Sequence, residues 1–72
     1  MKFQVIFTYD EEYQGYVADV PALPGCMSQG KTMDEAVANI TEAIRGVLKA
    51  MERNGNPFRP DSYPAFVGEI AV

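Results

Sequence analysis

The sequence predicts a small α+β domain with the element order β-β-β-α-β. Short segments of alternating residues occupy the first thirty positions, one long segment with helical spacing follows, and another alternating segment closes the chain. With 72 residues the chain has room for one domain, which we expect to span 1–72. A chain this short buries only roughly 60% of the surface that it exposes when unfolded. Association with another chain would therefore add stability that its own core cannot supply.

The first strand is predicted over residues 2–9, where Phe3, Val5, Phe7 and Tyr9 share one face. The polar residues 10–15 predict a hairpin turn that ends in glycine. Residues 16–20 alternate again and predict a second strand. The following PALPG segment cannot continue a central strand, because its two prolines have no N–H to donate. A third short strand is predicted over residues 26–29.

The helix has clear sequence signals at both ends. Thr32 is placed as its N-cap, and Glu35 lies three residues later, as in a capping box. Asn54 and Gly55 predict a left-handed C-terminal cap, and Pro57 forbids continuation. The apolar residues between these ends follow helical spacing along one stripe: Met33, Ala36, Val37, Ile40, Ala43, Ile44, Val47, Leu48 and Met51.

A fourth strand is predicted over residues 66–72. A right-handed crossover through the helix would place it parallel to the first strand, giving a four-stranded sheet of order 3-2-1-4 with the helix on one face. Ile6, Val17 and Val67 alternate onto the other face. That uncovered face is expected to receive a partner or a second copy, so we expect a dimer or a larger homo-oligomer.

Composition excludes several classes of function. The chain has one cysteine and no histidine, so it offers neither an internal disulfide nor a zinc ligand set, and no metal or cofactor is expected. A net charge of −4 argues against direct nucleic-acid binding. No signal peptide and no run long enough to cross a membrane is recognisable, so a cytoplasmic location is expected.

The segment GYVADVPALPGCMSQGKTMDEAVANITEAI at residues 15–44 resembles the HicB-like antitoxin family. The resemblance lies in the aromatic residue after glycine, the PxLPGC loop, the Gly-x-Thr cap and the E-A-x-x-N-x-x-E-A-I helix. It implies a partial RNase H-like fold. It also implies a protein partner, a HicA-type toxin that is small, basic and cleaves RNA. Relatives usually add a C-terminal DNA-binding domain, for which the sequence up to Val72 shows no element.

The expected binding surface lies around the first hairpin. Among residues 1–30 the acids outnumber the single cation Lys2, and three of them are consecutive beside tyrosines. Acidic side chains can compete for the RNA-binding surface of a basic toxin, and tyrosine is a favoured interface residue. The alternative is a solvated turn with one or more tyrosines packed on the sheet. The candidate partner-binding residues are Tyr9, Asp10, Glu11, Glu12, Tyr13 and Tyr16.

No catalytic group is expected. An RNase H-like fold raises the question of a metal-dependent nuclease, for which Asp10, Glu42 and Glu69 are the candidate carboxylates. Glu42 is predicted on the polar side of the helix, away from the other two. Cys26 has no histidine to activate it and is interpreted as a small buried residue.

The last features to interpret are a basic stripe on the helix and the alternative functions of the chain. The basic stripe Arg45, Lys49 and Arg53 is explained by the dipole of the helix C-terminus, rather than by RNA binding. The main alternative to an antitoxin is a stand-alone oligomeric ligand-binding or scaffold domain of the same fold. A cryptic metal-dependent nuclease is the remote alternative function.

Overall fold

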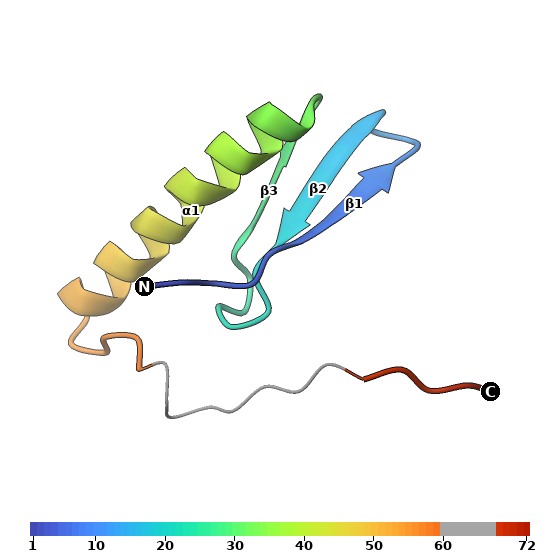
Figure 1. Cartoon of the computed structure of the whole chain (residues 1–72). Coiled ribbons are helices and arrows are strands. Elements are labelled where there is room, and N and C mark those ends of the chain that lie inside the picture. Colours follow the sequence, from blue (N-terminus) through green and yellow to red (C-terminus); the bar gives the residue numbers. More distant parts are fainter. Residues whose placement is uncertain (60–67) are drawn as a thin grey trace.

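The computed structural model describes residues 1–59 and 68–72, and in these residues it has three strands and one helix. The strands are β1 (Ile6–Asp10), β2 (Gly15–Asp19) and β3 (Met27–Gly30), and the helix is α1 (Met33–Arg53). The strands form one antiparallel sheet of order β1-β2-β3, with α1 lying across one face (Figure 1). The predicted α+β class is confirmed.

The first strand begins later than the alternation predicts. In the register of the β1–β2 pair, Ile6 lies opposite Asp19 and Asp10 lies opposite Gly15. Val20 has already turned into the next loop, so residues before Ile6 have no strand opposite them. Phe3 and Val5 nevertheless pack against the core, as their alternation predicts.

The four-stranded sheet of order 3-2-1-4 is not found among the described residues. Residues 68–72 contain no strand and lie apart from the sheet in Figure 1, and Ile70 is 89% exposed. Residues 66 and 67 lie outside the described part of the chain. An alternating pattern shows that a segment suits a sheet, but a strand also needs a hydrogen-bonded neighbour, which the local sequence does not specify.

The PALPG segment folds as two consecutive turns. The Leu23 N–H donates to the Val20 carbonyl at 3.0 Å, and the Cys26 N–H donates to the Leu23 carbonyl at 2.9 Å. The second turn has Pro24 followed by Gly25, whose φ of +83° only glycine adopts readily, as a type II turn requires. The Val20 N–H closes the loop onto the Cys26 carbonyl at 3.1 Å. The loop therefore buries Leu23, with Cys26 directly after it, and leaves its two prolines and Ala22 exposed.

Both helix caps follow the sequence signals. The Thr32 hydroxyl accepts a hydrogen bond from the Glu35 N–H at 3.1 Å, and the Glu35 carboxylate accepts one from the Lys31 N–H at 2.9 Å. The reciprocal bond thus reaches one residue further back than in a standard capping box. At the other end, the Gly55 N–H donates to the Glu52 carbonyl and the Asn56 N–H to the Met51 carbonyl, which is a Schellman motif.

The core lies between the sheet, the PALPG loop and α1. Its buried cluster comprises Ala18, Val20, Leu23, Cys26 and Ile40, and the helix packs against β2 and β3. Most of the predicted helical stripe is buried or half-buried, whereas Met33 and Val37 remain 39% and 45% exposed. In the described ranges, no helix has the length and apolarity needed to cross a membrane.

The sheet face away from the helix is open. Ala18 is buried on the helix side, and Phe7 lies opposite it, so the alternate residues of each strand point the other way. Ile6 and Val17 lie on this open face, as predicted, and so does Met27. Ile6 and Met27 are 52% and 56% exposed. Val67, the third residue predicted there, lies outside the described residues.

The first turn of α1 packs directly on the backbone of Gly30. A Cβ atom built on Gly30 would lie 2.3 Å from the backbone nitrogen of Ala36 and 2.7 Å from the Cβ of Glu35. These distances are too short for any side chain, and a backbone atom cannot move aside as a flexible side chain can. Glycine at this position is therefore a condition for the helix to approach β3.

We expect Gly30→Ala to lower the free energy of unfolding by about 1–3 kcal/mol, because the added methyl must push the helix away from the strand. The matched control is Gly46→Ala in the middle of α1, where a new Cβ meets nothing within 4 Å. That change should raise stability by about 0.5–1 kcal/mol through helix propensity. Urea unfolding of both variants measures the difference, and equal effects would refute the close packing at Gly30.

Thr32→Ala removes the acceptor of the cap bond and should cost about 1 kcal/mol. In a domain of this size that corresponds to a fall in Tm of roughly 4–8 °C. Thermal unfolding followed by circular dichroism measures it, with Thr32→Ser as the control that retains the hydroxyl. An unchanged Tm for Thr32→Ala would mean that the bond contributes nothing to the start of the helix.

Candidate functional site

The turn between β1 and β2 is held by Asp10. One carboxylate oxygen of Asp10 accepts hydrogen bonds from the N–H groups of Glu12 and Tyr13, at 2.9 Å and 3.1 Å. Gln14 completes the turn with a φ of 56°, in the left-handed region. This geometry leaves Glu11 and Glu12 exposed at the tip. Asp10 thus shapes the turn, while the two glutamates are the acids that it displays.

Lys31 ties the tip of this hairpin to the start of the helix. Its ammonium group donates a hydrogen bond to the backbone carbonyl of Tyr13 and lies 3.8 Å from the centroid of the Tyr13 ring. Such a cation–π contact adds to the hydrogen bond. The backbone of Lys31 is itself bonded to Glu35 of α1. The hairpin tip is thereby fixed relative to α1. Sequence reasoning missed Lys31, because nothing local links it to a residue 18 positions away.

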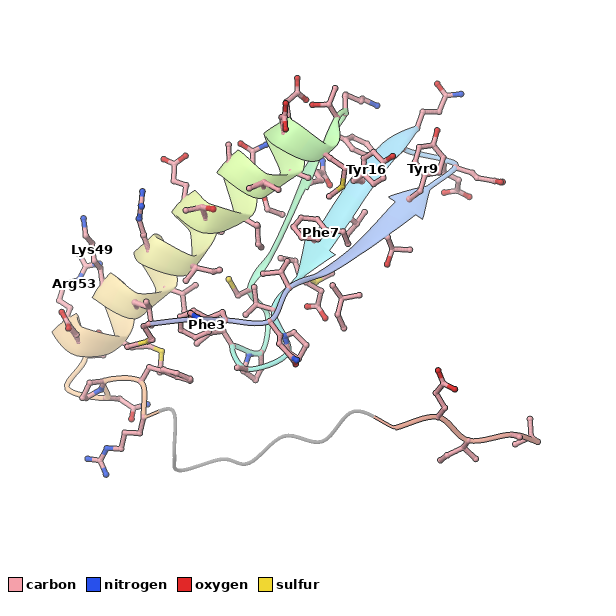
Figure 2. The ribbon with its side chains drawn as sticks, in the orientation of Figure 1. Phe3, Phe7, Tyr9, Tyr16, Lys49 and Arg53 are labelled. Carbon is pink, nitrogen blue, oxygen red and sulfur yellow. The ribbon has the colours of Figure 1, made fainter. Side chains whose placement is uncertain are left out.

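Tyr9 and Tyr16 form a cross-strand pair. They lie opposite each other in the β1–β2 register, and their rings meet edge to face with centroids 5.4 Å apart. Figure 2 shows the two rings near the hairpin end of the sheet. Tyr9 is 54% exposed, whereas Tyr16 is half-buried. The ring of Tyr16 therefore packs against the ring of Tyr9 and restricts its movement.

The six predicted residues lie together at one end of the molecule, but their side chains differ in exposure. Tyr9, Glu11 and Glu12 are exposed, whereas Asp10, Tyr13 and Tyr16 are half-buried. We call this set of six the hairpin surface. Lys49 and Arg53 of the basic stripe lie at the far end of α1 from Tyr9 (Figure 2). The acidic and basic regions are thus well separated.

The three carboxylates considered for a nuclease do not converge. Asp10 is engaged in the turn, Glu42 is exposed on α1, and Glu69 lies in the segment outside the sheet. Within residues 1–59 and 68–72, no three His, Cys, Asp or Glu side chains are grouped so that they could hold a metal ion.

Cys26 is a buried position of the core. The thiol is free and buried, 2% exposed. Loss of hydration on burial raises the pKa of the Cys26 thiol above its usual value, and the nearby Asp19 carboxylate raises it further. Because the thiolate is the nucleophilic form, the interpretation of Cys26 as a small core residue agrees with its surroundings.

A family model described as HicB_like antitoxin of bacterial toxin-antitoxin system matches residues 3–67. This chain belongs to the HicB-like antitoxin family. The match covers the hairpin, the PALPG loop and the whole of α1. It confirms the resemblance identified in the sequence, and it assigns the chain to a family whose members act in toxin–antitoxin systems.

Curated relatives of this HicB-like chain come from both archaea and bacteria. A UPF0150 protein of Thermoplasma acidophilum is 47% identical over 62 residues, covering 86% of this chain and 88% of the relative. A UPF0150 protein of Helicobacter pylori is 49% identical over 43 residues, covering 60% of each chain. An uncharacterized 14.9 kDa protein of Haemophilus phage HP1 is 49% identical over 37 residues, 51% of this chain and 28% of that protein. No solved structure matches the chain.

The raised pKa of Cys26 predicts how stability responds to alkaline pH. The unfolded chain releases the thiol proton at a lower pH than the folded chain, so rising pH favours unfolding once it exceeds the unfolded pKa. This contribution is fully present below that pKa and is lost as pH rises through the folded value. Urea unfolding between pH 7 and pH 10 should show a steeper loss of stability than in Cys26→Ala. If stability falls with pH equally in the unmodified chain and in Cys26→Ala, this prediction is wrong.

Proposed function

We propose that this HicB-like chain is a cytoplasmic antitoxin that neutralises a HicA-type toxin, a small basic protein that cleaves RNA. It acts by binding, not by catalysis. The hairpin surface covers the region of the toxin that would hold RNA. The observation that carries this proposal is the end of the β1–β2 hairpin, where two exposed glutamates on a hydrogen-bonded turn lie next to the exposed Tyr9 of β1.

Charge supports this surface as the binding site. A protein that binds RNA presents positive charge to the phosphates, and an acidic surface competes for the same region. Glu11 and Glu12 are exposed, and they are consecutive residues of the turn. Asp10 contributes less to a partner directly, since its carboxylate is already bonded to the turn.

Rigidity supports it as well. A side chain that is already held in place loses little conformational freedom when a partner binds, and less binding free energy is lost to ordering. Tyr9 rests against Tyr16, and Tyr13 is held by Lys31. Tyr9, with more than half of its surface exposed, is the residue best placed to insert into a pocket of the toxin.

The complete domain is proposed to have the four-stranded sheet of order 3-2-1-4, with the last strand beside β1, and to assemble as a dimer or larger homo-oligomer. The outer edge of β1, which has no second partner among the described residues, and the alternating residues 68–72 support this arrangement. The exposed Ile6 and Met27 on the open face are consistent with assembly. The same features would serve the alternative function, an oligomeric scaffold without a toxin.

The direct test uses the product of the neighbouring gene, expected to be a short basic protein. Co-expression followed by affinity purification should recover both chains in one complex. Adding this chain in equal amount should stop RNA cleavage by the purified product of the neighbouring gene. If that protein neither binds this chain nor cleaves RNA, the result would favour the alternative function as an oligomeric scaffold.

We expect the hairpin variants to separate the two rates of binding. The double change Glu11→Gln and Glu12→Gln should lower the association rate and flatten its dependence on salt, because exposed charges mainly steer the encounter. Tyr9→Ala should instead raise the dissociation rate, by roughly tenfold or more for a buried interface aromatic. Surface plasmon resonance at several salt concentrations measures both rates.

The control for these variants is a triple neutralisation of Arg45, Lys49 and Arg53 to Gln. This variant makes the net charge more negative by three, whereas the hairpin double variant makes it less negative by two, and its three cations lie on the exposed side of α1 toward the C-terminal end. Both rates should stay nearly constant. If the triple variant is the one that abolishes binding, the toxin binds the helix and the hairpin assignment is wrong.

A further inference from the structure

Strand β1 is the outer strand of the sheet that the described residues form. Within residues 1–59 and 68–72 it pairs with β2 alone, and α1 packs against β2 and β3. The opposite edge, β3, is partly covered, since the side-chain nitrogen of Asn39 donates to the Gln29 carbonyl at 2.7 Å. Natural edge strands are usually guarded by proline, lysine or a bulge. β1 reads IFTYD in an unbroken register and has none of these.

Apolar side chains flank this edge on both faces of the sheet. Ile6 is 52% exposed on the open face, and Tyr9 is 54% exposed on the helix side. A strand added beside β1 would pair with its outward N–H and C=O groups and remove both side chains from water. The exposed edge therefore has both the hydrogen-bonding groups and the apolar surface that a strand requires.

Residues 68–72 have the properties of the missing strand. Gly68, Ile70 and Val72 alternate with Glu69 and Ala71. Ile70 is 89% exposed and Val72 is fully exposed, and Figure 1 shows this segment apart from the sheet of its own chain. Exposed apolar residues with period-two spacing gain from burial beside an edge strand.

The chain between the helix and this segment is long enough for the segment to reach a second copy. The Phe58 ring contacts the Phe3 ring, with centroids 5.1 Å apart, so the chain leaves the helix next to the residues that precede β1. A strand of the same copy would need to move only about 5 Å sideways to lie beside β1. The sequence provides nine residues, 59–67, between this contact and the segment. Nine residues reach at most roughly 30 Å, which is enough for the segment to lie on the β1 edge of another copy.

We propose that residues 68–72 of one copy add as the fourth strand to the β1 edge of a second copy, which returns its own segment to the first. The exchange closes a twofold dimer in which each sheet has the order 3-2-1-4 and its fourth strand comes from the partner. It deepens the proposed assembly and does not depend on a toxin. Failure to bind a toxin and failure to exchange strands are therefore separate results.

The test is disulfide cross-linking between two differently tagged full-length chains. One chain carries Thr8→Cys on β1, and the other carries Ile70→Cys or, in a parallel sample, Ala71→Cys. Residues 70 and 71 point to opposite faces of a strand, so one of them shares the face of Thr8. The buried Cys26 is kept, because it is not accessible to a second thiol. After co-expression and mild oxidation, a species of twice the chain mass carrying both tags is expected.

The matched control replaces Thr8→Cys by Arg45→Cys, an exposed position on α1. It should give no mixed species above background. A single chain with both Thr8→Cys and Ile70→Cys, or with Thr8→Cys and Ala71→Cys, tests the competing arrangement. A cross-link that forms only within one chain, at the mass of a monomer, would overturn the exchange.

The oligomeric state measured by sedimentation is a second, independent test. The unmodified chain should sediment as a dimer at micromolar concentration, and Ile70→Glu should shift it toward monomer by at least tenfold in the dissociation constant. Arg59→Glu, which adds negative charge outside the segment, should leave the dimer in place. A monomeric unmodified chain, or a dimer untouched by Ile70→Glu and giving no mixed cross-link, would also overturn the proposal.

Discussion

The contact between the first turn of α1 and the backbone of Gly30 is the constraint on which the rest of the structure depends. It brings the helix close enough for Ala36 and Ile40 to be buried against the sheet. Lys31 lies between this contact and the Thr32 cap, so its position is fixed, and its side chain can hold the hairpin tip. A small shift of the helix would therefore change the position of the hairpin surface as well as the packing of the core.

The sequence predicted the helix well because its signals are local. The Thr32 cap, the apolar stripe and the Asn54–Gly55 end all act within a few residues, and each lies where it was expected. The strands were placed to within a few residues, but their ends depend on partners. The first strand started too early because nothing faces residues before Ile6. The last strand, predicted over residues 66–72, is not found in residues 68–72, and residues 66 and 67 lie outside the described part of the chain.

The candidate site was only partly predictable. Its residues could be grouped because a hairpin brings neighbours in sequence together. The separate roles of Asp10 and the two glutamates could not be seen, because they depend on which carboxylate bonds to the turn. The role of Lys31 depends on packing between distant segments. The sequence predicted where a surface would lie, and the three-dimensional contacts separate the side chains that build it from those that it presents.

The contacts of this domain lie mainly between consecutive elements. β1 pairs with β2, β2 with β3, and α1 packs chiefly on the β3 strand that precedes it. A low contact order of this kind is associated with fast folding, since little loop entropy is lost before native contacts form. The hairpin, the PALPG loop and the helix can thus fold through contacts with the element next to them in the chain, without waiting for a distant segment to arrive.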